Sequence, residues 1–185
     1  MRHVVWAAFH LLFAIAILAG AIASDARAQT GGKDCTDASD LQDMIACERR
    51  RQEERAARCA NAPAARLVLP VEGQRVLSYG DKTTFGTTSK GHVFETAGAT
   101  PVRSPAAGVV VFAGEFRSYG KLVIVDACAI DVVIAGAASV SVKAGDRVAS
   151  GDALGAMSST PGAVLYFEVR ENGRAIDPNP LLGAN

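Results

Sequence analysis

Glycine and proline divide this chain into two unlike parts. Residues 37–60 read DASDLQDMIACERRRQEERAARCA and contain neither glycine nor proline. Good helix formers dominate this run, and Ser39 or Asp40 is placed to cap its first turn. The sequence therefore predicts a helix here. From Asn61 onward, glycines and prolines recur at short intervals, so no comparably long helix can follow.

The later part of the chain has the pattern of short β-strands separated by turns. Turn residues such as Gly80 with Asp81, and the run at 171–173, punctuate it. Segments rich in Val, Ile, Phe and Tyr, which favour strands, occupy residues 75–79, 92–95, 108–113, 121–126, 132–135 and 164–170. The pattern predicts a mainly β fold, a compact β-sandwich or closed sheet, preceded by one N-terminal α-helix.

The N-terminus has the features of an export signal. A positively charged tip precedes residues 4–24, which carry no charged side chain, and Ala26, Arg27 and Ala28 form a small-x-small site. We expect cleavage after Ala28. A stretch of this length would also serve as a membrane anchor if it stayed uncut, so we expect membrane attachment only through an uncleaved signal.

We expect the chain to have three parts. Residues 1–28 are the expected signal peptide, residues 29–62 the helical N-terminal segment, and residues 63–185 a single β domain. The whole chain carries 19 basic and 19 acidic side chains, so it has no strong field to attract nucleic acid or an anionic membrane. We expect no nucleic-acid partner.

Four cysteines lie beyond the leader: Cys35, Cys47, Cys59 and Cys128. None forms the CxxC pair that a zinc knuckle needs. In an oxidising compartment their even number predicts two disulfides, and sequence alone leaves three connectivities open. A bond from the helical segment to Cys128 would clamp the helix to the β domain and add roughly 2 to 4 kcal/mol of stability through loop closure.

The helix is expected to have one apolar and one charged side. Leu41, Met44 and Ile45 can share the apolar side. The run ERRRQEER at residues 48–55 is interpreted as a solvated face, and a docking surface for a partner is the minority interpretation.

Four motifs in succession carry a family resemblance. They are TPVRSPAAGVVVFAG, YGKLVIVD, VKAGDRVASGDALGAM and LYFEVRENGRAIDPNPLL. In this order they resemble the LytM-like, lysostaphin-type peptidase domain, whose members are cell-wall zinc endopeptidases and their catalytically inactive relatives. The resemblance covers about residues 69–182, and it implies a LytM-like β domain in the periplasm.

A carrier domain is the alternative for part of this region. VRSPAAGVV and VKAGDRVASGDALG also resemble the two halves of a biotinyl or lipoyl carrier. A carrier needs a lysine at a hairpin tip, and the one lysine between Val109 and Asp126 is Lys121, inside a strand-like run. The C-terminal motif has no place in a carrier, so we disfavour this alternative.

The resemblance implies that the family's zinc and catalytic positions are altered. Its three metal-site motifs fall on SKGHV, IAGAA and VLYFE, which places the five positions at Ser89, Val93, Ala137, Val164 and Tyr166. Valine and alanine have no lone pair to offer, and a phenol with a pKa near 10 is a poor zinc ligand at neutral pH. His92 is the only histidine beyond the leader, and one imidazole cannot build the site. We expect no metal, no cofactor and no catalysis.

Other catalytic chemistries are poorly specified. No histidine besides His92 is available as a base for a serine, and no GxSxG motif exists. Acids are commonly scattered over strand surfaces, and nothing fixes a glycosidase-like separation for the candidate pairs Glu95 with Asp126 and Glu168 with Glu171.

The resemblance also implies a regulatory role. Inactive members of the family commonly bind a cell-wall amidase and relieve its autoinhibition. We therefore expect a noncatalytic regulator of peptidoglycan hydrolysis that contacts an amidase or another envelope protein through a groove lined by Lys90, His92, Arg117, Tyr119 and Tyr166. Tyr and Arg are frequent interface anchors, and core packing is the alternative for the two tyrosines.

The second hypothesis is a peptidoglycan-binding or structural envelope module without an amidase partner.

Overall fold

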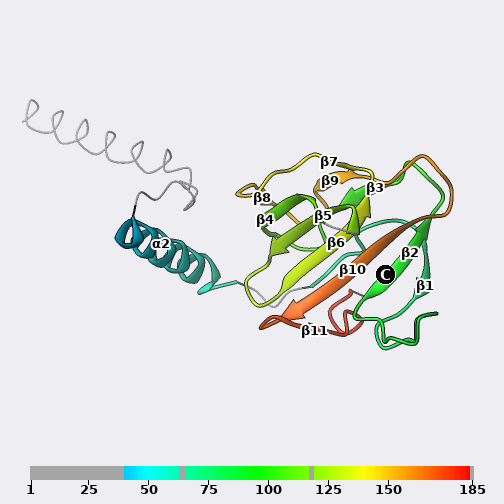
Figure 1. Cartoon of the computed structure of the whole chain (residues 1–185), viewed down its shortest axis with the longest axis horizontal. Coiled ribbons are helices and arrows are strands. Elements are labelled where there is room, and N and C mark those ends of the chain that lie inside the picture. The colour runs from blue at the N-terminus through cyan, green and yellow to red at the C-terminus, as the bar shows by residue number, and fades with distance from the viewer. Residues whose placement is uncertain (1–39, 63–65, 117–118, 184–185) are drawn as a thin grey trace, which may run out of the picture. The chain divides into compact units, whose positions relative to one another are not determined.

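The computed structural model describes residues 40–62, 66–116 and 119–183 (Figure 1). The chain forms two compact units that divide within a helix, after Glu53. The predicted export signal, and Ser39 as a possible cap, lie outside the described residues. In the part of the chain that the structure describes, no helix has both the length and the apolar character to cross a bilayer. The boundary at residue 62 between helical segment and β domain stays a prediction.

Helix α2 (Leu41–Cys59) confirms the helix predicted from the glycine-free run. Asp40 is its cap: the Asp43 N–H donates to Asp40 Oδ1 over 2.9 Å, and the Met44 N–H donates to the Asp40 carbonyl over 3.1 Å. None of the residues of α2 is buried, and the predicted apolar side chains of Leu41 and Ile45 are exposed. Burial of an apolar stripe therefore does not account for this helix, and the contacts of its last turn, described below, become important.

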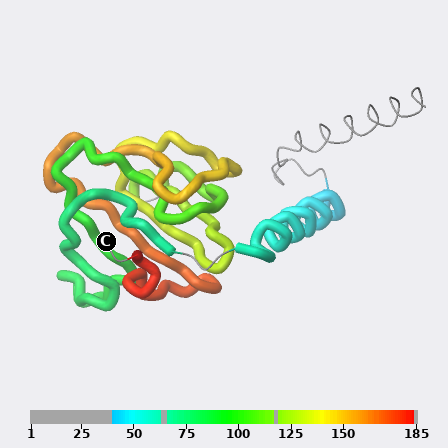
Figure 2. Tube along the Cα trace, turned by 180° about the vertical axis from the view of Figure 1, so that it is seen from behind, coloured from blue at the N-terminus to red at the C-terminus, as the bar shows by residue number. Residues whose placement is uncertain are grey.

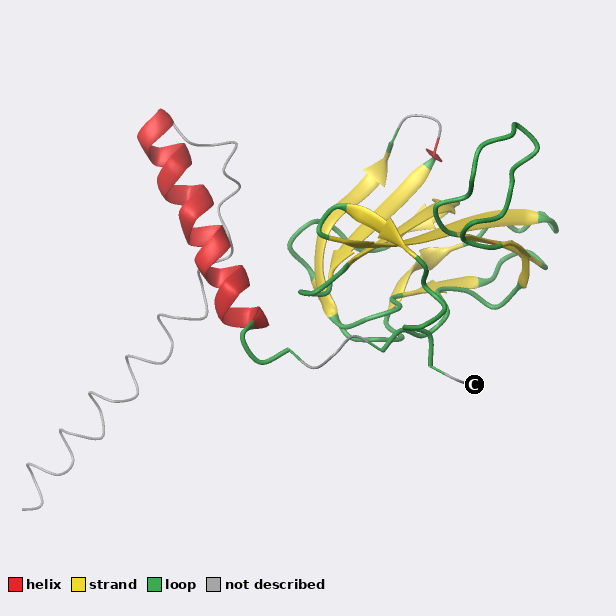
Figure 3. Ribbon diagram, turned by 90° about the horizontal axis from the view of Figure 1, so that it is seen from below, coloured by secondary structure: helices red, strands yellow, loops and turns green. Residues whose placement is uncertain are grey.

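Apart from a short helical piece at Tyr119, the remaining described chain is built of strands and loops, as Figure 3 shows. It contains eleven strands: β1 (Gln74–Leu77), β2 (His92–Thr96), β3 (Pro101–Arg103), β4 (Gly108–Glu115), β5 (Lys121–Asp126), β6 (Asp131–Ala137), β7 (Ser139–Val140), β8 (Arg147–Val148), β9 (Ala153–Ala156), β10 (Ala163–Glu171) and β11 (Arg174–Ile176). The six predicted strands correspond to β1, β2, β4, β5, β6 and β10. The five others are short and were not predicted.

The strands form two antiparallel sheets around one core. The large sheet has the order β1-β2-β10-β6-β5-β4-β8, with β11 paired to β10, and the small sheet has the order β3-β9-β7. Phe167 and Val125 of the large sheet belong to the same buried cluster as Val102 and Leu154 of the small sheet. The predicted mainly β, sandwich-like fold with an N-terminal helix is confirmed.

The two ends of the β domain lie side by side. The Leu67 N–H donates to the Leu181 carbonyl over 2.8 Å, and the Gly183 N–H donates to the Leu67 carbonyl over 3.0 Å. Leu67 is buried in the core, so both ends are fixed to the domain. Figure 2 shows the red C-terminal segment beside the teal segment that begins the domain.

Candidate functional site

The large sheet has a second face, opposite the core, which we call the outer face. Successive side chains on a strand point to opposite sides, and Leu165, Phe167 and Val169 of β10 point into the core. The residues of β10 between them therefore lie on the outer face. By the same alternation and by strand register, the outer face carries Val93, Glu95, Phe112, Leu122, Ile124, Asp126, Asp131, Val133, Ala135, Val164, Tyr166, Glu168 and Arg170.

The centre of the outer face is apolar. Leu122, Val133 and Ala135 form a buried cluster of their own, separate from the main core. Phe112, Ile124 and Tyr166 pack against this cluster and are themselves half-buried. The centre is thus a packed surface, and water has little access to its floor.

Four aromatic rings, which we call the aromatic row, extend across this centre. The ring centroids are 6.0 Å apart between Phe112 and Phe116, 6.5 Å between Phe116 and Tyr119, and 6.5 Å between Tyr119 and Tyr166. These rings come from β4, the β4–β5 connection and β10. Tyr119 is 53% exposed, and nearby on β10 Val164 is 51% exposed. This part of the outer face therefore presents apolar and aromatic side chains to the surroundings.

Next along β10, a buried carboxylate fixes the hydroxyl of Tyr166. The Tyr166 hydroxyl donates to Glu168 Oε2, and Arg170 Nε donates to Glu168 Oε1. Burial, followed by the hydrogen bond to Glu168, raises the pKa of Tyr166 far above its usual range. The hydrogen bond from Arg170 to Glu168 raises the pKa of Arg170 as well. Tyr166 is therefore a neutral hydrogen-bond donor, already committed to Glu168.

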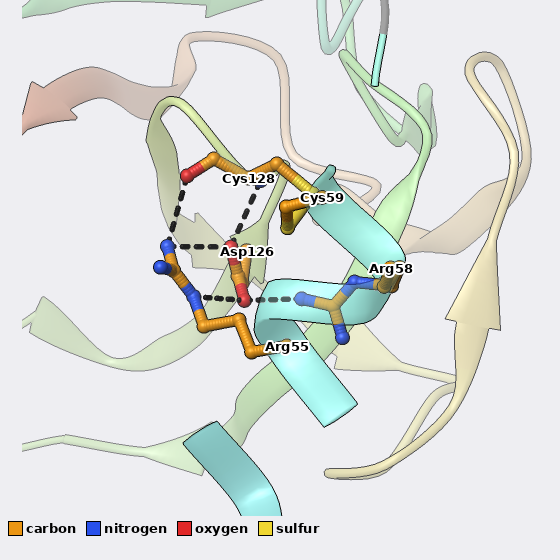
Figure 4. Close-up of polar contacts among 5 residues, drawn as sticks. All are labelled: Arg55, Arg58, Cys59, Asp126 and Cys128. Atoms are coloured by element: carbon orange, nitrogen blue, oxygen red, sulfur yellow. Dashed lines mark hydrogen bonds and ion pairs between the residues drawn. A yellow bond between two sulfur atoms is a disulfide. The ribbon is translucent and has the colours of Figure 1, made fainter. Parts of the chain in front are cut away.

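The far end of the outer face carries a charged cluster that ties down the last turn of α2 (Figure 4). Arg55 donates from Nε to Asp126 Oδ2 over 2.9 Å and from Nη2 to Asp126 Oδ1 over 3.1 Å. Arg58 also donates to Asp126, and a disulfide joins Cys59 to Cys128. We call these five residues the latch. Of the cysteines that the sequence left as candidates to bond Cys128, the structure selects Cys59. Cys47 is also disulfide-bonded, and Cys35 lies outside the described residues.

The latch keeps Asp126 ionised although its carboxylate is buried. Burial is the largest influence on this carboxyl and opposes ionisation, but the hydrogen bonds from Arg55 and from the Cys128 N–H outweigh it and lower the pKa of Asp126. Arg55 also donates to the Cys128 carbonyl over 2.9 Å. In neighbouring Asp131, burial and the charge of Asp126 raise the pKa. The folded protein thus favours the negative charge on Asp126 and disfavours the negative charge on Asp131.

Of the five positions implied to be the family's zinc and catalytic positions, the structure brings three together on the outer face and places the other two in buried surroundings. Val93 and Tyr166 are direct neighbours on β2 and β10, and Val164 lies two residues away on the same face. Ser89 is buried, and its hydroxyl donates to the Gly91 carbonyl over 2.8 Å. Ala137 belongs to the main core, behind the outer face.

The side chains at these positions do not fit a zinc ion. Valine and alanine have no donor atom, and the hydroxyls of Ser89 and Tyr166 donate their protons within the protein. Among the described residues, no group of three or more His, Cys, Asp or Glu side chains could hold a metal ion. The candidate acid pairs do not converge either: Glu95 and Asp126 lie at opposite ends of the outer face, and Glu168 and Glu171 lie three positions apart on β10, pointing to opposite sides.

The predicted groove residues have different positions. Lys90 is exposed, Tyr119 and Tyr166 belong to the aromatic row, and Arg117 lies outside the described residues. The prediction that His92 lines the groove is corrected by the structure, since His92 is 0% exposed. Its neighbour Val93 occupies the outer face, so His92 points into the core.

His92 is a satisfied core histidine. Its Nδ1 accepts a hydrogen bond from the Tyr79 N–H over 3.1 Å, and its ring contacts Phe94 and Phe167. Burial, followed by the nearby charge of Arg75, lowers the pKa of His92. The imidazole therefore supports packing of the β1–β2 connection and offers nothing to a ligand on the outer face.

The comparisons with known proteins identify the fold. Residues 87–178 match Peptidase family M23. The β domain belongs to this family. The match includes much of both motifs that also resemble a carrier domain, so the M23 assignment replaces that alternative. The domain is LytM-like, and it is similar to part of the murein hydrolase activator EnvC of Escherichia coli.

Relatives of this M23 domain are longer proteins. The murein hydrolase activator EnvC of Escherichia coli is 32% identical over 126 residues, which are 66% of this chain and 30% of EnvC. An uncharacterized protein of Neisseria meningitidis serogroup B is 37% identical over 117 residues, 62% of this chain and 20% of that protein. The chain thus spans less than a third of either curated relative. The structure of Helicobacter pylori Csd3 is similar with a TM-score of 0.58 and 27% identity, covering 66% of this chain and 34% of Csd3.

Proposed function

We propose that this chain is a noncatalytic, periplasmic regulator of peptidoglycan hydrolysis that binds a cell-wall amidase through the aromatic part of the outer face. The observation that carries the proposal is the composition of that face. In an M23 domain, its centre holds the aromatic row and Val164, and no convergent set of metal donors. The similarity to EnvC, whose name describes a murein hydrolase activator, supports the same role.

The chemistry of the face supports a role without catalysis. Tyr166 keeps its proton and donates a hydrogen bond to Glu168, and Val164 and Val93 cannot bind a metal ion. Zinc in this family would supply a polarised water, which needs about three protein ligands. The described residues provide no such set.

The same face supports protein contact. Exposed aromatic rings beside aliphatic side chains are typical of interface centres, where one large anchor contributes much of the binding free energy. Tyr119 and Val164 are each about half exposed, and neighbouring Tyr166 packs against the buried cluster of Leu122, Val133 and Ala135, which holds this part of the surface in place. A rigid surface loses little conformational entropy on binding.

A periplasmic location is supported by the sequence and the disulfides. The N-terminal export pattern predicts secretion, and disulfides such as Cys59–Cys128 persist in oxidising compartments. An envelope amidase would meet the chain there.

The test is an amidase assay with intact sacculi. Purified residues 29–185 are added to each amidase of the same envelope, and release of labelled peptide is measured. We expect stimulation by the unmodified chain and a loss of at least about tenfold in apparent affinity for Tyr166→Ala, because the variant removes an anchor ring. Lys90→Ala should weaken stimulation less, and Lys143→Ala, an exposed lysine on the β7–β8 connection, is the matched control. Tight zinc with cleavage of wall peptides by the chain alone, or no stimulation of any amidase, would overturn the proposal.

The aromatic row also supports a second candidate, direct binding of peptidoglycan. Aromatic rings stack on the apolar faces of sugar rings, and Tyr119 is exposed enough to do so. Sedimentation of the purified chain with sacculi separates the candidates. Sedimentation that Tyr119→Ala abolishes, without any amidase stimulation, would favour the second.

A further inference from the structure

The most exposed large apolar side chain described in this structure belongs to none of the strands that form the outer face. Phe85 is 92% exposed, in the connection between β1 and β2. Neither the fold nor the proposed amidase contact explains it. Phenylalanine is usually buried, and burying its side chain stabilises a protein or a complex by roughly 1.5 to 3 kcal/mol.

A tight β-hairpin presents this ring. Lys82 and Thr88 pair in an antiparallel bridge, the Thr83 N–H donates to the Thr87 carbonyl over 2.8 Å, and the Gly86 N–H donates to the Thr83 carbonyl over 2.9 Å. Gly86 has a φ of 75°, which only glycine adopts without strain. This is a three-residue hairpin loop in which a turn is followed by a left-handed glycine. Phe85 is therefore held at the tip by the backbone.

Side-chain bonds strengthen the hairpin and occupy its polar groups. The hydroxyls of Thr83 and Thr87 lie 2.7 Å apart in a hydrogen bond, and Lys82 Nζ donates to Thr88 Oγ1 over 3.2 Å. Three of the four threonine hydroxyls around the tip are used in this way. The ring of Phe85 is thus the main feature that the hairpin offers to a partner.

We propose that the Phe85 hairpin is a second contact site for the hydrolase partner, which receives the phenyl ring in an apolar pocket. This inference rests on the proposed function. A preorganised turn avoids most of the ordering entropy that binding a flexible loop would cost, so a single ring can act as an anchor. The exposed Lys82 and Lys90 flank the hairpin, so a pocket with acidic residues at its rim fits best.

Two other occupants fit the hairpin less well. Stable attachment to a membrane needs more than one insertion signal, and only one apolar side chain projects from this tip. Sugar recognition usually combines a stacked ring with directed hydrogen bonds, and the hydroxyls of Thr83, Thr87 and Thr88 already have hydrogen-bond partners within the hairpin.

The test measures binding of purified residues 29–185 to each purified amidase of the same envelope by calorimetry. We expect Phe85→Ala to raise the Kd at least about tenfold, while Thr84→Ala, a change at the neighbouring position of the same turn, alters it less than about twofold. Because Phe85 is exposed, the free energy of unfolding of Phe85→Ala should match that of the unmodified chain, which separates lost contact from lost folding.

The outcomes distinguish this inference from the proposed function. If Tyr166→Ala weakens binding and Phe85→Ala does not, the hairpin is not a contact site, although the amidase role stands. If no amidase binds the unmodified chain, both proposals fail. Sedimentation of the chain with anionic phospholipid vesicles, lost in Phe85→Ala, would assign the hairpin to a membrane surface and overturn the protein contact.

Discussion

At one end of the outer face, Asp126, Arg55 and Arg58 satisfy one another, whereas at the other end Tyr119 and Val164 leave about half of their surface exposed. Both ends belong to the face of one sheet, with Asp126 on β5 and Val164 on β10. The latch uses its side chains for internal contacts that hold the helix terminus. At the aromatic end, Tyr119 and Val164 make few contacts within the protein, so these side chains remain available for a partner. Substitutions at the two ends should therefore separate stability from binding.

The largest effect on stability is expected from the disulfide of the latch. Cys59 and Cys128 are 69 residues apart in sequence, and closing a loop of this length stabilises the folded state by about 4 kcal/mol in the chain-entropy account. Replacing both cysteines by serine should lower the free energy of unfolding by this amount, measured by equilibrium denaturation in urea. The two single replacements should each cost about as much as the double one, since either removes the bond. A loss below about 1 kcal/mol would show that the helix terminus is held chiefly by its ion pairs.

A smaller loss is expected from Asp126→Asn. The change removes the charge that Arg55 and Arg58 share, and it leaves partly buried Arg58, whose Nε has no hydrogen-bond partner among the described residues, without compensation. We expect a loss of about 2 to 3 kcal/mol in the same assay. The matched control is Asp131→Asn, which should change stability by less than about 0.5 kcal/mol or raise it, because this carboxyl already has a raised pKa.

The pH dependence of that loss has a definite sign. The pKa of Asp126 is lowered in the folded protein, so its contribution is complete above its unfolded pKa of 3.8 and is lost as pH falls through the folded pKa. The difference in unfolding free energy between the unmodified chain and Asp126→Asn should therefore be constant near neutrality and shrink below pH 3.8. A difference that stays constant down to pH 2 would exclude the charge as its origin.

The smallest effect on stability is expected at the aromatic end. Val164→Ser changes a half-exposed side chain, so the free energy of unfolding should change by less than about 0.5 kcal/mol. The same variant should still weaken amidase stimulation, because it places a hydroxyl in the apolar contact. Destabilisation above about 1 kcal/mol would mean that this end, like the latch, serves the fold.

Sequence reasoning located the elements with strong apolar patterns. β5 and β6 carry continuous runs of Val and Ile, and they were predicted within one or two residues. β7, β8 and β9 have two to four residues each, in a segment dominated by turn residues. Such short strands are stabilised by pairing with distant strands, so their own residues give no periodic signal.

The site was predicted less completely, because strand register decides which side chains reach the surface. His92 and Val93 are adjacent, and a shift of one position on a strand moves a side chain from the core to the surface. Sequence cannot resolve such a shift without the pairing partner. The sequence analysis treated Asp126 only as a member of a candidate acid pair, although a bond from the helical segment to Cys128 would bring the helix close to Asp126, two residues away in sequence. That hint was the available signal for the latch.

The bridge between Leu67 and Leu182 has a consequence for how this domain can be combined with others. A module whose entry and exit strands meet can be spliced into a host polypeptide at a single point, with short connectors on both sides and no rearrangement of its interior. In its relatives the matching region is a minor portion of a much longer polypeptide, so there too the domain is combined with other sequence.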